Sequence, residues 1–251
     1  MPADLRDAPP GRVLLLSKSA AARQVGAEFL GAGLLVTVVV GSGLAAERLS
    51  PGDAGLQLLQ GSLATALGLT VLIVVLQPVS GAHLNPVVTL AGRALGAAPA
   101  VRVALGYVAA QLLGAVAGAA LANAMFGTAT SISTTDRLEP GQLLAEVVAT
   151  AGLVLVIFAL LRTGRAALIG PAVGAYIGAA YWFTSSTAFA NPAVTVGRVF
   201  TDAAAGIAPV SALWFVAAQL VGGVLGVALV LSLYPAIPDR KAPPCPTPSR
   251  P

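Results

Sequence analysis

Charged and aromatic residues are scarce in this sequence. Of its 251 residues, 10% are charged and 5% are aromatic, whereas 57% are hydrophobic, and the mean hydropathy is +0.86. Soluble domains carry about 25% charged residues, so this chain cannot cover a water-facing surface and is expected to lie in a lipid bilayer. The net charge of +4 matches the basic bias of cytoplasmic loops in membrane proteins, and a nucleic-acid partner is not expected.

Cysteine and histidine are nearly absent. The single cysteine, Cys245, excludes an internal disulfide. Together with the single histidine, His83, it cannot build a Cys/His metal site, so we expect neither a metal nor a cofactor. No base accompanies the hydroxyl groups of Ser185, Ser186 and Thr187 in the pattern of a catalytic nucleophile, so an enzyme is not expected.

Long apolar stretches fill most of the chain. Several of them exceed the roughly 18 residues that suggest a transmembrane helix. We predict an all-α membrane protein with six spans, at residues 23–43, 56–77, 102–126, 142–161, 166–183 and 211–234. Glycine and alanine are abundant and allow helices to pack closely in lipid.

One phrase occurs twice between these spans. It reads Asn85-Pro86-Val87-Val88-Thr89 after the second span and Asn191-Pro192-Ala193-Val194-Thr195 after the fifth. Asn favours the N-cap of a helix, and Pro favours its first position. The apolar pattern that follows each phrase covers about ten residues, too few to cross a bilayer. We therefore predict two half-helices, one in each half of the chain.

The two halves also repeat one another outside this phrase. The third and sixth spans share the pattern Val-Ala-Ala-Gln-Leu, which contains Gln111 and Gln219. The first and fourth spans each contain an Ala-Glu pair, with Glu28 and Glu146. A repeat of three spans places its two copies in inverted orientation. The predicted architecture is thus six transmembrane helices plus two half-helices in an inverted three-span repeat.

Positive charge sets the predicted orientation. Most Lys and Arg residues fall on the side of the membrane that carries both chain termini, so both termini are expected in the cytoplasm. We predict a cytoplasmic arm at residues 1–20, a channel domain at 21–235 and a disordered cytoplasmic tail at 236–251. The two repeats of the channel domain cover about residues 21–127 and 141–235.

The two half-helices predict the chemistry at the centre of the bundle. Irregular backbone at membrane depth is tolerated only where it is buried in protein or lines a cavity, and the inverted repeat brings both loops to the midplane. Two helix N-termini, each with partial positive charge and free N–H groups, then face each other. The side-chain amides of Asn85 and Asn191 add further donors. Such a pore repels cations and suits a neutral, hydroxylated solute.

These motifs resemble those of the aquaporins and aquaglyceroporins, the major intrinsic protein family. The resemblance covers about residues 23–234 and includes the spans, the two Asn-Pro motifs, and the repeated Glu and Gln. It implies a homotetramer in the plasma (inner) membrane, with one passive pore per protomer for small neutral solutes and water, and half-helix dipoles that exclude cations. The pore-lining residues that it implies are Asn85, Pro86, Val87, Asn191, Pro192 and Ala193.

The sequence departs from the family pattern at two positions. Val87 replaces the usual Ala of the first motif, and Val194 replaces an Arg that usually lines the outer constriction, the selectivity filter. The other expected filter residues are Leu67, Ala188 and a residue between Ala179 and Trp182, for which we choose Trp182. Without the charge and donors of an Arg, we expect a wider and more apolar filter. Family members found with arsenic-resistance genes share this Val, which suggests glycerol, urea and uncharged metalloid acids such as arsenous acid as solutes.

Several residues have more than one interpretation. Arg198 lies one turn beyond Val194 and would be able to replace the missing charge, but we expect it to face loops or lipid headgroups. His83 is either a pH sensor or a neutral, hydrogen-bonded loop residue, and we favour the second. Glu28 and Glu146 are either a proton relay or structural anchors of the Asn-Pro loops. We favour anchors, supported by Gln111 and Gln219.

Three other functions stay open at this stage. A strict water channel has the same architecture with a narrower filter. An ion-coupled secondary transporter also uses inverted repeats and broken helices, but it needs an ion site. A junction protein would use the same fold without useful flux.

Overall fold

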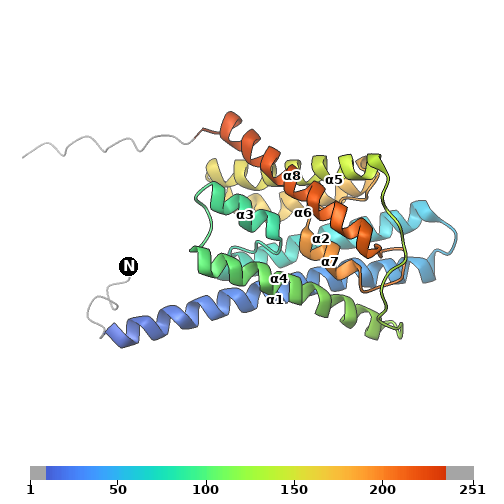
Figure 1. Ribbon diagram of the computed structural model, residues 1–251, viewed down its shortest axis with the longest axis horizontal. Helices are drawn as coiled ribbons and strands as arrows, with labels where there is room; N and C mark the ends of the chain where they lie inside the picture. The colour runs from blue at the N-terminus through green and yellow to red at the C-terminus, as the bar shows by residue number, and fades with distance from the viewer. Residues whose placement is uncertain (1–9, 236–251) are drawn as a thin grey trace, which may run out of the picture.

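The computed structural model describes residues 10–235, with side chains from residue 19 onward. Every regular element in this range is helical (Figure 1). The elements are α1 (Pro10–Leu49), α2 (Ala54–Ser80), α3 (Pro86–Ala94), α4 (Val101–Met125), α5 (Pro140–Arg162), η2 (Ala166–Leu168), α6 (Ile169–Phe183), α7 (Pro192–Arg198) and α8 (Pro209–Leu233). Six segments are long and apolar enough to cross a membrane, which confirms the predicted all-α membrane fold, and α3 and α7 are the two half-helices.

The first helix is longer than the predicted span. Helix α1 begins at Pro10, inside the predicted cytoplasmic arm, and continues to Leu49, beyond the predicted end at residue 43. The reason is local, because the residues that lead into the span include Leu14–Leu16, Lys18 and Ala20–Ala22, which favour helix. The remainder of the arm, residues 1–9, and the predicted tail, 236–251, lie outside the described residues.

The two halves of the chain pack in the same way. Helix α1 packs against α2 and α4, and its counterpart α5 packs against α6 and α8. Each half-helix also contacts a long helix of the other half, α3 against α8 and α7 against α4, and the two half-helices contact each other (Figure 1). This exchange brings the two Asn-Pro loops together inside the bundle.

The two ends of the bundle are easily told apart. The loops at residues 50–53, 126–139 and 199–208 lie together at one end, on the right in Figure 1. We call this end the far face. The opposite end, where the described chain begins and ends, is the terminal face.

Glycine pairs bring the long helices into close contact. A Cβ atom on Gly114 would lie 2.2 Å from the carbonyl oxygen of Phe29, and one on Gly118 would lie 2.0 Å from that of Gly33. Helices α1 and α4 therefore touch along their backbones. The pairs Gly174/Gly178 in α6 and Gly222/Gly226 in α8 also meet atoms of neighbouring helices. All three pairs thus make contacts within one chain.

We expect Gly118→Ala to lower the free energy of unfolding by about 1–3 kcal/mol, the usual effect of overpacking. The added methyl group has no room against the carbonyl of Gly33. Thermal unfolding in detergent, followed by circular dichroism, would measure the change. Gly26→Ala is the control, because a Cβ there meets nothing within 4 Å and Ala favours helix. Equal stability of the two variants would contradict the prediction.

Candidate functional site

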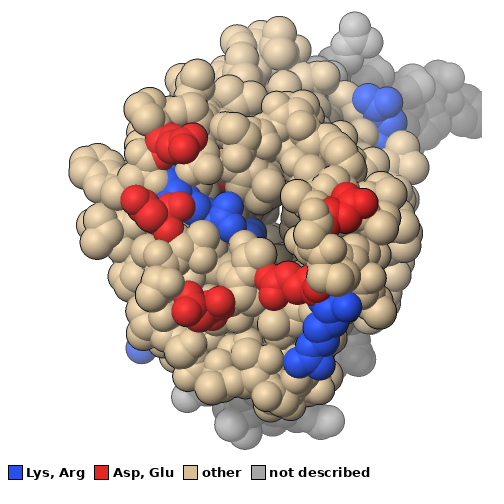
Figure 2. All heavy atoms as spheres, turned by 90° about the vertical axis from the view of Figure 1, so that its right-hand side faces the viewer, with Lys and Arg blue, Asp and Glu red and all other residues tan. Residues whose placement is uncertain are grey.

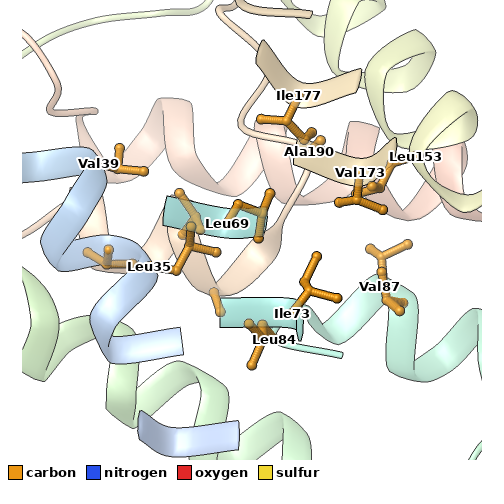
Figure 3. Close-up of a cluster of buried hydrophobic side chains, with 14 of the residues drawn as sticks. Leu35, Val39, Leu69, Ile73, Leu84, Val87, Leu153, Val173, Ile177 and Ala190 are labelled. Atoms are coloured by element: carbon orange, nitrogen blue, oxygen red, sulfur yellow. The ribbon is translucent and has the colours of Figure 1, made fainter. Parts of the chain in front are cut away.

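The buried apolar cluster at the centre of the bundle surrounds a cavity. The side chains labelled in Figure 3 come from α1, α2, α3, α5, α6 and both Asn-Pro loops, and they converge on one region. Most of them line a cavity of about 190 Å³. Its lining extends from Gln77 and Ala97 at the terminal-face end to Tyr181 and Arg198 at the far-face end. We call this cavity the pore.

Polar groups are confined to a few positions of the pore lining. Most of the wall consists of Leu, Val, Ile, Ala and Phe side chains. The polar exceptions are Thr65, Gln77, His83, Asn85, Tyr181, Asn191 and Arg198. No group of three or more His, Cys, Asp or Glu side chains within the described residues is arranged to hold a metal ion. A solute in this cavity would therefore meet an apolar surface and a few hydrogen-bonding groups.

The two motif asparagines each hold together two elements. Asn85 and Asn191 are the N-caps of α3 and α7, and each Oδ1 accepts a hydrogen bond from a backbone N–H of its own helix, at 2.9 Å. Each Nδ2 donates across the molecular centre, from Asn85 to the carbonyl of Ala190 and from Asn191 to that of Leu84, both at 2.8 Å. An amide nitrogen carries two hydrogens. One hydrogen of each asparagine is thus left to donate to a solute.

The other four motif residues do not face the pore. Pro86, Val87, Pro192 and Ala193 are buried but do not line the cavity. Val87 packs against α8, where its Cγ1 lies 2.6 Å from the position of a Cβ on Gly223. The reason is geometric, because each half-helix points its N-terminal end at the cavity and its side chains stand out sideways. The implied lining of the central motif is therefore corrected to the two asparagines.

Two buried carboxylates hold the Asn-Pro loops in place. Glu28 accepts hydrogen bonds from the hydroxyl of Ser80, the backbone N–H groups of His83 and Leu84, and the amide of Gln111, at 2.6–3.0 Å. Glu146 accepts the equivalent four from Ser186, Phe189, Ala190 and Gln219, at 2.6–2.9 Å. Each carboxylate therefore ties a loop to two of the long helices.

The loops need this support because their backbone is strained. Ala82, Leu84, Ala188 and Ala190 have φ between 47° and 49°, the left-handed region that non-glycine residues rarely adopt. Such residues cost of the order of 1–3 kcal/mol each and persist only where the surroundings enforce them. The repeated strain turns the carbonyls of Leu84 and Ala190 toward the asparagines of the opposite loop.

The loops differ at one pair of equivalent positions, two residues before each Asn. In the first loop His83 lines the pore, and its Nδ1 lies 3.1 Å from the hydroxyl of Thr89. The Thr89 hydroxyl donates to the carbonyl of Asn85, so it accepts from a protonated Nδ1 and leaves Nε2 for the pore. In the second loop the residue is Phe189, which makes an apolar contact with Phe215 instead. The two ends of the pore are therefore chemically different.

Two of the expected filter residues lie outside the pore. Leu67 is 60% exposed and Trp182 is 53% exposed, and neither lines the cavity. The pore is lined instead by Thr65 and Tyr181, whose hydroxyl oxygens lie 3.0 Å apart. Each residue of a helix is rotated by about 100° from the one before it. Leu67 is two residues from Thr65, and Trp182 is one residue from Tyr181, so each expected residue lies on a different face of its helix. Thr65 is one of several polar residues in this span, together with Gln60, Ser62 and Thr70, so polarity alone does not single it out in the sequence.

Ala188 and Val194 line the same cavity as this hydroxyl pair. Both are buried and line the pore. Arg198 also lines it and is only 4% exposed, so the expectation that it faces lipid headgroups is wrong, whereas its contact with the loop at residues 199–208 agrees with the expectation that it faces loops. Its guanidinium carbon lies 3.4 Å from the ring centroid of Phe189, and its Nε donates to the carbonyl of Ala205. This packing, which sequence spacing does not reveal, keeps the charge at the far-face end of the pore.

The comparisons with known proteins agree with this architecture. The family model "Major intrinsic protein" matches residues 15–189. Aquaglyceroporin AqpS of Rhizobium meliloti (strain 1021) is 47% identical over 218 residues, which are 86% of this chain and 92% of that protein. Aquaporin-2 of Homo sapiens is 45% identical over 106 residues, 42% of this chain and 37% of its own. The structure of the aquaglyceroporin from Plasmodium falciparum superposes with a TM-score of 0.66 at 22% identity, covering 85% of this chain and 96% of that one.

Proposed function

Because the chain belongs to the major intrinsic protein family, we propose that its solutes include glycerol, urea and uncharged metalloid acids such as arsenous acid. The aquaglyceroporin members of this family are channels and not enzymes, so the chain is a channel for small neutral solutes. One observation carries the choice of solutes. Val194 lines the far-face end of the pore where the family usually has an Arg. A short aliphatic side chain there leaves room for a solute larger than water.

We take Thr65, Tyr181, Ala188 and Val194 as the filter. The two hydroxyls of Thr65 and Tyr181 offer hydrogen bonds on one side, and Ala188 and Val194 add only apolar groups. A polyol or a neutral oxyacid also has hydroxyl groups and less polar parts. Such a solute would replace hydrogen bonds to water with hydrogen bonds to the two hydroxyls, and its less polar parts would lie against the apolar groups. The cost of desolvating the solute is thereby limited.

The middle of the pore would conduct the same solutes in single file. The free amide hydrogens of Asn85 and Asn191 donate to a solute oxygen, and the apolar wall opposite offers no competing partner. The N-termini of α3 and α7 add partial positive charge at this point. A cation would lose its water there without gaining an acceptor, so passive flux is restricted to neutral species.

Stopped-flow light scattering on proteoliposomes tests this function directly. Parallel gradients of water, glycerol and arsenous acid should each give faster volume changes than protein-free liposomes. Fast water flux without solute flux would support the strict water channel instead. Solute flux that depends on a proton or sodium gradient would support a secondary transporter, and no flux of any kind would support a junction protein.

We also propose a homotetramer in the plasma (inner) membrane with both termini in the cytoplasm. The exposed apolar side chains of the six spans support the bilayer as the surrounding medium. Helix α1 runs from the terminal face and α8 returns to it, so the described part of the chain begins and ends on one side. The basic residues concentrated near that side indicate the cytoplasm.

The single cysteine makes the orientation testable. Cys245 belongs to the C-terminal tail, outside the described residues. In intact cells a membrane-impermeant maleimide should leave it unmodified, and after permeabilisation the same reagent should label it fully. Mass spectrometry of the purified protein would measure both. Labelling in intact cells would place the C-terminus outside and reverse the orientation.

A further inference from the structure

The far face contains a hollow with two arginines. Figure 2 shows basic side chains inside this hollow and acidic ones around its rim. The hollow is a second cavity of about 170 Å³, and its lining includes Arg137 and Arg198. Arg198, Tyr181 and Val39 line both cavities, so the hollow adjoins the outer end of the pore. Any solute that enters from this side meets the two guanidinium groups first.

The two guanidinium groups are held in fixed positions. Arg137 donates through Nε to the carbonyl of Gly206, at 2.9 Å, and through Nη2 to that of Ala204, at 2.7 Å. Arg198 donates to the carbonyl of Ala205 in the same loop. Their guanidinium carbons lie 5.4 Å and 3.4 Å from the ring centroid of Phe189, so both groups gather over one aromatic ring. This arrangement places two positive charges close together.

Three acidic residues of the far face, of which Glu47 lines the hollow, bind other groups. Glu47 accepts from the backbone N–H of Ala204, and Asp202 from the N–H and hydroxyl of Thr134. Asp136 accepts from the hydroxyl of Ser211, at 2.7 Å, which keeps the pKa of its carboxyl below the usual value. Within the described residues, the side-chain hydrogen bonds of the two arginines go only to backbone carbonyls. The charges of the pair are therefore not used in structural ion pairs.

Each guanidinium also keeps unused donors. A guanidinium has five N–H groups, and these contacts account for two in Arg137 and one in Arg198. A buried pair of like charges is unfavourable unless an opposite charge compensates it. The fork of N–H groups matches the oxygens of phosphate or carboxylate, which bind in charge-assisted, bidentate geometry. The hollow has the size, charge and donors for one such group.

We propose that Arg137 and Arg198 form a binding site for one small oxyanion, such as inorganic phosphate, at the far-face mouth of the pore. The site is separate from the conduction of neutral solutes. The apolar pore wall would not replace the hydration of an anion, so the bound anion stays at the mouth. There it obstructs the entry of neutral solutes, which is the part of the inference that rests on the proposed function.

Direct binding tests the site without any flux. Purified protein in detergent should bind ³³P-phosphate in a scintillation proximity assay, and excess sulfate should displace it. Arg137→Gln and Arg198→Gln should each weaken binding by about tenfold or more, since a charge-assisted hydrogen bond is lost. Arg137→Lys keeps the charge and should retain part of the affinity. It keeps the test informative if the variant of the buried Arg198 does not fold.

Arg48→Gln is the matched control. Arg48 lies at the end of α1, donates to the carbonyl of Phe126 and lines neither cavity, so its loss should leave phosphate affinity within about twofold of that of the unmodified protein. Absence of phosphate binding by the unmodified protein, or equal loss in Arg48→Gln, would overturn the proposal. External phosphate should also slow glycerol entry into proteoliposomes. Intact binding without any glycerol flux would contradict the proposed function and leave the anion site in place.

Discussion

Replacing Val194 by Arg is expected to reduce glycerol and arsenous acid flux by about tenfold or more, while water flux falls by a smaller factor. A tenfold change corresponds to a barrier higher by about 1.4 kcal/mol. Val194 lines the pore, as do Ala188 and the hydroxyl pair of Thr65 and Tyr181. An Arg side chain at this position extends into the space that a polyol needs, and water is small enough to pass it. Stopped-flow light scattering with separate water and solute gradients measures both rates.

A second substitution separates the effect of size from that of charge. Val194→Met introduces a side chain that is longer than Val, though shorter than Arg, and has no charge or strong donors. If space alone sets selectivity, Met should slow glycerol about as much as Arg does. If the new charge dominates, because Arg198 lies one turn away on the same helix, only Arg should have a large effect. Equal slowing of water and glycerol by Arg would contradict a filter at this position.

The features of the fold that depend on local signals were predictable from the sequence. The Asn-Pro phrase predicts a helix start wherever it occurs, because Asn caps and Pro fits the first position, and both half-helices begin at the predicted residues, Pro86 and Pro192. The inverted arrangement follows from the odd number of spans in each repeat. These predictions do not require knowledge of which side of a helix faces the pore.

The filter residues were only partly predicted, because identifying them requires knowing which side of each helix faces the pore. The register of α2 depends on how residues 81–85 are folded, and the left-handed backbone of Ala82 and Leu84 makes this loop compact in a way that spacing does not reveal. The expected filter residue Leu67 lies two residues after Thr65, which lines the pore opposite Leu67's exposed position. The burial of Arg198 in the pore lining depends on a tertiary contact with Phe189, which the sequence spacing does not show. The two repeats differ at this point in the sequence, because Phe189 stands where the first loop has His83. This difference indicates that the surroundings of Arg198 are not those of its counterpart in the first repeat.

Replacing Glu146 by Ala should prevent the protein from folding stably, with loss of flux for every solute. The carboxylate is fully buried and accepts four hydrogen bonds, from the hydroxyl of Ser186, two backbone N–H groups and the amide of Gln219. Each buried donor left without a partner costs about 1–3 kcal/mol. Several such losses approach the entire stability of a typical protein, about 5–15 kcal/mol. Size-exclusion chromatography in detergent and thermal unfolding would detect the effect.

Two further variants distinguish an anchor from a proton relay. Glu146→Gln keeps one oxygen for the Ser186 hydroxyl and the Phe189 N–H, but it turns an NH₂ group toward the donors of Ala190 and Gln219. An anchor therefore predicts an intermediate loss of stability, with flux falling in proportion to the folded fraction. A relay predicts a fully stable protein that loses only dependence on a proton gradient. Glu139→Ala is the control, because Glu139 precedes the same helix but its side chain makes no capping hydrogen bond, and it should leave both stability and flux unchanged.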